Sequence, residues 1–129
     1  MKKTIFMDKY PVYSLEISKD ETSYKNVDEI ITYLHSLVEE HKIATFIATF
    51  DHYTHTKSVN GVINDEIKDA KNIIFCFGKA IPNTKILAAR PRSIGVCELE
   101  NSYVVDFLEA PNEQLIEVME DWAKSISNV

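Results

Sequence analysis

The chain has 129 residues, of which 45% are hydrophobic and 26% charged, and its formal net charge is -6 at pH 7. This length suits one domain with a single core, so we expect residues 1–129 to form one unit. The acidic balance argues against nucleic-acid partners, no run approaches the ~20 apolar residues of a membrane span, and two cysteines do not imply a disulfide framework. We therefore expect a cytoplasmic protein with neither nucleic-acid nor membrane partners.

The first half of the chain predicts a strand, a helix and a second strand. Residues 12–18 (VYSLEIS) alternate between apolar and polar, which is typical of a half-buried strand. Asn26 can cap a helix whose apolar residues then recur at helical spacing as far as Val38. Residues 43–50 (IATFIATF) are rich in β-branched and aromatic side chains and predict a central strand.

The middle of the chain is less regular. Residues 51–61 (DHYTHTKSVNG) are polar and predict a loop, and residues 62–70 predict a short helix. Residues 72–78 (NIIFCFG) predict a buried strand that ends at a glycine. Residues 85–99 predict another strand, with Pro91 at a bulge or an edge because proline cannot donate to a ladder.

The end of the chain predicts a hairpin and a helix. Glu100 and Asn101 form a short turn into a strand over residues 102–109. Pro111 fits the first turn of a final helix with a regular apolar stripe. The order strand, helix, four strands, helix predicts an α+β fold, in which two helices pack on one face of a mainly antiparallel sheet. The other face is then solvated, covered by loops, or paired with a second subunit.

Histidine and cysteine are the first candidates for chemistry. His52 and His55 could bind a metal or act as bases, but residues three apart face opposite sides of a strand and no third ligand follows at a familiar spacing. We therefore expect no metal and no cofactor. The alternative role for His52 is to close the strand by bonding Asp51 or the backbone. Cys76 and Cys97 stand in apolar contexts that favour packing over nucleophilic catalysis.

Charge is sorted along the sequence. Residues 71–97 contain no carboxylate and five cations: Lys71, Lys79, Lys85, Arg90 and Arg92. The loop 78–84 (GKAIPNT) adds backbone donors, and Thr84 adds a hydroxyl, although the loop lacks the pattern of a P-loop. Two interpretations stay open. Lys79, Arg90 and Arg92 bind a small anion, or they form salt bridges with acids of the hairpin: Glu98, Glu100, Asp106 and Glu109.

Three stretches together resemble the family called domain of unknown function 302. They are residues 50–53 (FDHY), residues 74–84, and residues 94–111 with their strand, turn, strand and proline-led helix. The resemblance implies an α+β domain of the TATA-box-binding-protein-like class, and it makes self-association plausible without implying DNA binding. Asp51 and His52 match the family's Asp-His pair. Gly78, Lys79 and Thr84 match parts of its loop.

These observations favour a small non-enzymatic domain, which we expect to be a homodimer that binds a small anionic ligand or a protein partner. The candidate binding residues are Asp51, His52, Gly78, Lys79, Thr84, Arg90 and Arg92. One alternative is an enzyme in which His52 is a general base and Lys79 or Arg90 stabilises developing negative charge. A purely structural assembly module is the other alternative.

Overall fold

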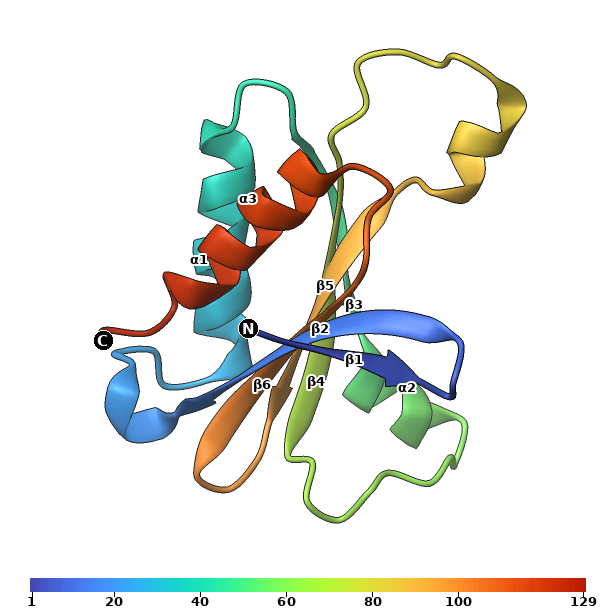
Figure 1. Cartoon of the computed structure of the whole chain (residues 1–129). Coiled ribbons are helices and arrows are strands. Elements are labelled where there is room, and N and C mark those ends of the chain that lie inside the picture. Colours follow the sequence, from blue (N-terminus) through green and yellow to red (C-terminus); the bar gives the residue numbers. More distant parts are fainter.

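The computed structural model describes residues 1–129 and is built around one antiparallel sheet (Figure 1). Its neighbours follow the order β1-β2-β6-β5-β4-β3. The strands are β1 (Lys2–Phe6), β2 (Tyr10–Ser18), β3 (Thr45–Asp51), β4 (Asp69–Cys76), β5 (Arg92–Glu98) and β6 (Ser102–Leu108). The helices are α1 (Val27–Glu40), α2 (His52–Ser58) and α3 (Glu113–Lys124), with two 3-10 turns, η1 (Lys19–Glu21) and η2 (Thr84–Ala88). The expected α+β class and the antiparallel sheet are confirmed.

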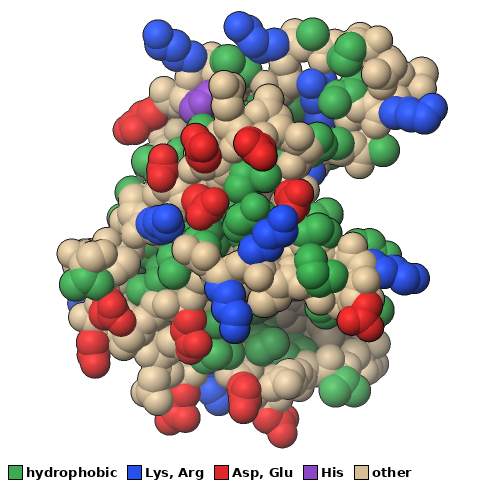
Figure 2. Space-filling view, viewed as in Figure 1, with side chains coloured by type: hydrophobic (Ala, Val, Ile, Leu, Met, Phe, Trp, Pro, Cys, Tyr) green, Lys and Arg blue, Asp and Glu red, His purple; other side chains and the backbone are tan.

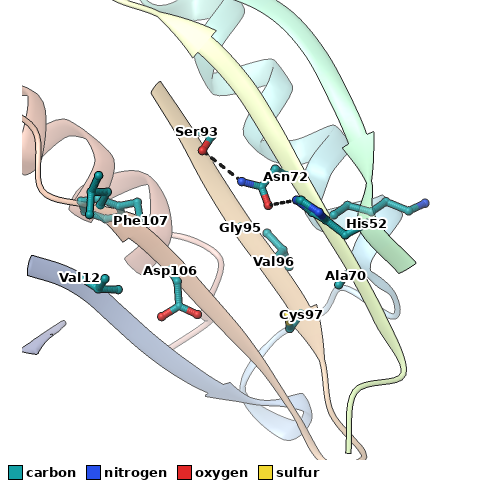
Figure 3. A pocket seen from close by; sticks show the side chains of 12 residues that line it. Val12, His52, Ala70, Asn72, Ser93, Gly95, Val96, Cys97, Asp106 and Phe107 are labelled. Atoms are coloured by element: carbon teal, nitrogen blue, oxygen red, sulfur yellow. Dashed lines mark hydrogen bonds between the residues drawn. The ribbon is translucent and has the colours of Figure 1, made fainter. Parts of the chain in front are cut away.

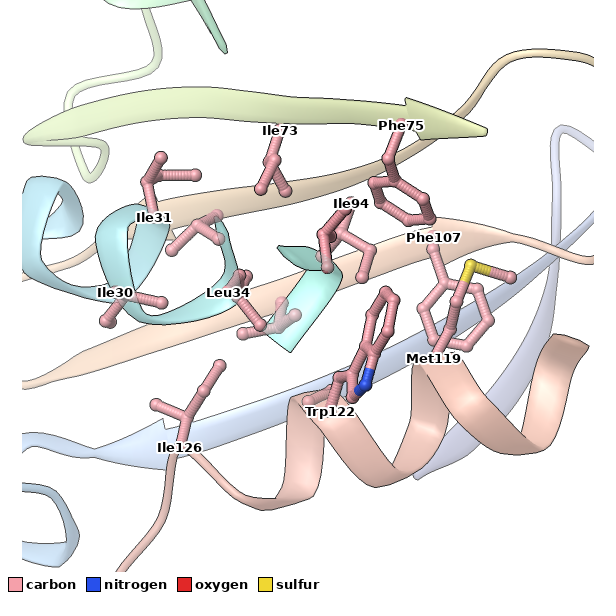
Figure 4. Packing of buried hydrophobic residues seen from close by; sticks show 14 of the residues in the cluster. Ile30, Ile31, Leu34, Ile73, Phe75, Ile94, Phe107, Met119, Trp122 and Ile126 are labelled. Atoms are coloured by element: carbon pink, nitrogen blue, oxygen red, sulfur yellow. The ribbon is translucent and has the colours of Figure 1, made fainter. Parts of the chain in front are cut away.

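Helices α1 and α3 lie side by side on one face of the sheet and enclose the core (Figures 1 and 4). Trp122 of α3 stacks on Phe77 and meets Phe75 of β4 edge-on, each at 5.5 Å between ring centroids. From α1, Ile30 and Leu34 are fully buried against the same face. This packing of two amphipathic helices on one sheet face is the main source of stability, because each buried side chain of this size contributes roughly 1.5–3 kcal/mol.

Local capping explains where the two long helices begin. The Asn26 side chain accepts the Glu29 N–H at 2.8 Å, and the Glu29 carboxylate accepts the Lys25 N–H at 3.0 Å. Asn112 caps α3 in the same way by accepting the Gln114 N–H at 2.8 Å. Pro111 therefore precedes the cap and does not lie in the first turn, where we had expected it.

Three sequence predictions about residues 43–70 are wrong. Strand β3 covers most of residues 43–50 but lies at an edge of the sheet and not at its centre. Residues 62–70 form no helix, because Asn64 turns the chain by accepting the Glu66 N–H, and β4 already begins at Asp69. The helix of this region is α2 instead, within the stretch predicted as a loop.

The strand predicted over residues 85–99 is shorter than expected. Asn83 accepts the Ile86 N–H at 3.1 Å and starts the 3-10 turn η2, so the chain leaves the sheet after β4 and returns only at Arg92. Pro91 follows a cis peptide bond just before β5, outside the ladder. The hairpin of β5 and β6 around Glu100 and Asn101 is confirmed. None of the helices has both the length and the hydrophobicity of a membrane span.

Candidate functional site

The predicted site residues fall into two groups at opposite ends of β4. Asp51 pairs with Lys71 near the beginning of this strand, and His52 contacts Asn72. Gly78 and the cations around it lie beyond its end. Gly78 lies six positions after Asn72 along the chain, which corresponds to about 20 Å at the usual strand rise. The structure therefore does not bring Asp51 and His52 together with Lys79, Arg90 and Arg92.

Asp51 is the cap of helix α2. Its two carboxylate oxygens accept the backbone N–H and the hydroxyl of Thr54, each at 2.9 Å. The Lys71 ammonium group lies 3.7 Å away and also pairs with Asp28 of α1. The Thr54 hydrogen bonds, with Lys71, hold the pKa of Asp51 below its ordinary value, because they stabilise the charged carboxylate. These contacts assign Asp51 a structural role.

His52 borders a hollow of about 390 Å³ on the sheet face opposite α1 and α3 (Figure 3). Asn72 donates to the Ser93 hydroxyl at 3.1 Å, so its amide oxygen accepts from His52 Nε2 at 3.0 Å. The His52 ring is therefore held by a side chain of β4, and not by Asp51 or the backbone as the alternative role had it. Asn72 and Ser93 were missed by the sequence analysis, although each adjoins a fully buried isoleucine in a strand.

The hollow lacks an activated nucleophile. Burial, with the nearby carboxylates of Asp106 and Asp69, raises the pKa of the Cys97 thiol and keeps it protonated at neutral pH. The Asp106 carboxylate accepts a hydrogen bond from the Ser14 hydroxyl. No group of three or more His, Cys, Asp or Glu side chains lies close enough together to hold a metal ion.

A second cavity, of about 440 Å³, lies between the segment 77–91 and the beginning of helix α3. We call it the basic pocket, because Lys79, Arg90 and Arg92 line it and no carboxylate does. Its remaining walls are mostly apolar and come from four regions of the chain: Ile43, Phe77, Gly78, Ala80, Pro82, Ile86, Ala89, Pro111 and Leu115, with the polar Asn112 and Gln114 at the helix. Thr84 begins η2 and does not line the pocket.

None of the three pocket cations forms an ion pair. The hairpin acids that were their alternative partners are engaged elsewhere or unpaired: Lys19 lies 2.8 Å from Glu98, and Lys3 lies 2.7 Å from Glu109. Of the five cations in residues 71–97, only Lys71 has acidic partners. The salt-bridge interpretation of the basic stretch is therefore wrong for Lys79, Arg90 and Arg92.

Arg92 joins three segments around the basic pocket. Its guanidinium donates to the carbonyls of Leu108 at 2.6 Å, Glu109 at 3.0 Å and Ala89 at 3.2 Å. Its Nε–H is buried without an acceptor. Burial lowers the pKa of Arg92, because the charged form loses solvation that no counterion replaces.

Arg90 lies flat against the backbone of the same segment. It donates to the Ala80 carbonyl at 2.7 Å, and its guanidinium occupies the space where a side chain at Gly78 would begin. A Cβ atom at Gly78 would lie 2.6 Å from the guanidinium carbon. The absence of a side chain at Gly78 is therefore what lets Arg90 reach the pocket wall.

The fold and these cavities define a small α+β domain with a cationic pocket between the long β4-β5 connection and the beginning of helix α3. The chain belongs to a family of unknown function, DUF6858, whose model matches residues 1–128. No curated protein matches it.

The family match corrects the resemblance to domain of unknown function 302, which is wrong. That resemblance was based on three short stretches, and the structure explains each of them by ordinary local features. Residues 50–53 are the end of β3 and a capped helix start, residues 74–84 are the end of β4 and the turn that leads into η2, and residues 94–111 are a hairpin before a helix. The Asp-His pair and the loop positions inferred from that family are not carried further.

Proposed function

We propose that this protein binds a small organic anion in the basic pocket. The observation that carries the proposal is a cluster of three cations without counterions, around a cavity without carboxylates, in a chain of net charge -6. Arg92 is partly removed from water without a counterion, which is costly, and an anion beside it would offset that cost. Lys79 is exposed and adds positive charge at the mouth of the pocket. Figure 2 shows Lys and Arg side chains around the segment 77–91, at the top of the molecule.

The shape of the pocket favours an anion with an apolar body. Its volume of about 440 Å³ falls within the range of small-molecule sites, and Phe77, Ile86 and Leu115 provide hydrophobic walls. Helix α3 begins at the pocket, so the positive end of its dipole adds to the attraction for a negative group. An aromatic or aliphatic carboxylate matches both properties better than inorganic phosphate, which has no apolar surface.

Binding is favoured over catalysis by the distance between the two groups of residues. The enzyme alternative requires His52 and the stabilising cations Lys79 or Arg90 to act on one substrate. About 20 Å of strand separates them, which exceeds the hydrogen-bond reach that general-base catalysis needs.

Isothermal titration calorimetry with sodium benzoate tests the proposal. Wild-type protein should bind benzoate, and Lys79→Gln should weaken binding about tenfold through loss of one charge-assisted contact. Lys85→Gln is the matched control, because Lys85 is also exposed, unpaired and in the same segment, but does not line the pocket. This control should leave the affinity unchanged.

Two further probes separate the possible outcomes. Benzamide has the shape of benzoate without its charge and should bind at least tenfold more weakly. Inorganic phosphate should also bind more weakly than benzoate. Equal affinity of benzoate and benzamide would refute an anion site, and absence of binding for all three would favour the assembly module instead.

A further inference from the structure

The free edge of β3 has few of the charged residues that usually protect edge strands. Residues 45–50 (TFIATF) contain no charge and no proline, and the one charged residue of the strand, Asp51 at its end, caps α2; β1, at the other edge, carries Lys2 and Lys3. Charged side chains on an edge strand discourage pairing with another chain. A register shift between Phe46 and Ala48 leaves Ile47 outside the ladder and 49% exposed, so the irregularity adds an apolar side chain to the edge.

An apolar patch extends from this edge onto the segment 77–91. Ile47, Ile81, Leu87 and Pro91 line one open groove of about 640 Å³, to which Lys79 and Arg90 also contribute. We define the β3 patch by its exposed large side chains, which are Ile47, Phe50, Ile81 and Leu87. Figure 2 shows hydrophobic side chains exposed across the segment 77–91, at the upper right.

The size of the β3 patch is that of an interaction surface. Its four side chains are between 39% and 72% exposed. Together they present on the order of 400 Å² of apolar surface, which is within the range of functional patches on monomers. With the backbone of a seven-residue strand added, the area is that of a small interface, below the ~800 Å² that each partner buries in a standard complex.

We propose that β3 pairs antiparallel with β3 of a second copy, so that two sheets join into one continuous sheet. The amino-acid pattern of residues 43–50 is that of a central strand, and a partner strand would make β3 central. The pairing is self-complementary about a two-fold axis, because the same residues meet on both sides and none of residues 45–50 is charged.

The arrangement of the β3 patch favours the antiparallel direction. Ile81 and Leu87 belong to the segment beside the beginning of β3, whereas Phe50 lies near its end. An antiparallel partner places Ile81 and Leu87 of one copy beside Phe50 of the other. Apolar contact at both ends of the paired strands then acts against the net repulsion of two copies of charge -6.

Sedimentation velocity over a range of protein concentrations tests the pairing. Wild-type protein should sediment as a dimer, and Ile47→Lys, which gives β3 the protection that β1 already has, should raise the dimer dissociation constant at least tenfold. Thr4→Lys is the matched control, because it adds the same charge to the exposed edge strand β1. This control should leave the dimer intact.

Hydrogen exchange provides a second measurement on the same samples. Dilution should accelerate exchange of edge amides in β3 and not in β1. A wild-type protein that stays monomeric at about 1 mM would overturn the proposal, and so would a dimer that Ile47→Lys leaves intact or that both lysine variants weaken equally. Should Ile47→Lys fail to fold, Leu87→Lys places the charge on the same patch but outside the sheet, with the same expectation.

Discussion

The positions of Arg90 and Arg92 in the basic pocket depend on groups that are absent from the residues around them. Arg90 rests where Gly78 has no side chain, and Arg92 is held by backbone carbonyls and not by a carboxylate. A carboxylate partner would have neutralised Arg92 and removed its attraction for an anion. The carbonyl contacts orient the guanidinium and leave its charge in place.

Gly78→Ala should therefore reduce benzoate affinity with little effect on stability. The new Cβ would lie 2.6 Å from the Arg90 guanidinium carbon, which is the end of a flexible and partly exposed side chain, so Arg90 moves away at low cost. Calorimetry should show weaker binding, by roughly tenfold, and the free energy of unfolding in urea should change by less than about 1 kcal/mol. A large loss of stability with unchanged binding would contradict the assigned role of Gly78.

At the scale of elements, α2 depends on its cap. The seven residues of this helix have no buried side chain, and Asp51 holds its first turn through Thr54. So short a helix has little intrinsic stability, and its cap contributes a large share.

Asp51→Ala should destabilise the protein by about 1 kcal/mol at pH 7. Because the folded protein holds the pKa of Asp51 below its ordinary value, this contribution is complete above about pH 4 and is lost as the pH falls through the folded-state pKa. Urea unfolding of both proteins at pH 7 and near pH 2 should show the difference shrinking at the lower pH. Asn26→Ala, at the cap of α1, should cost a similar amount at both pH values, because the Asn26 amide does not titrate.

Elements determined by nearby residues were predictable, and those determined by distant ones were not. The cap at Asn26, the final amphipathic helix and the β5-β6 hairpin each depend on a few adjacent residues. The edge position of β3 depends on which strands flank it, and that is decided by the whole sheet. Likewise the sequence grouped Lys79, Arg90 and Arg92 by charge, but the contribution of Ile43 and of helix α3 to their pocket arises only from tertiary packing.

For the whole molecule, net charge acts in opposite directions on the two proposed contacts. Two copies of charge -6 repel each other, whereas the basic pocket attracts anions. Dissolved salt screens both effects.

Raising NaCl from about 50 mM to about 500 mM, where the screening length falls severalfold, should weaken benzoate binding and strengthen dimerisation. Calorimetry and sedimentation velocity at both salt concentrations measure the two changes. Benzamide binding provides the uncharged control and should stay nearly constant. If salt weakened both benzoate binding and dimerisation, or strengthened both, charge would not act in opposite directions on the two contacts.

The segment 77–91 lies between the two sites: Ile86 and Ala89 face the basic pocket, while Ile81 and Leu87 belong to the β3 patch. Gly78, Lys79, Ala80 and Arg90 line the hollows on both sides. A ligand in the basic pocket that orders these shared residues also orders part of the surface that contacts a second copy. Reciprocity then requires association to raise ligand affinity by the factor by which the ligand raises association. The protein would then respond to its own abundance, with occupancy of the pocket rising as the chain accumulates even at constant ligand.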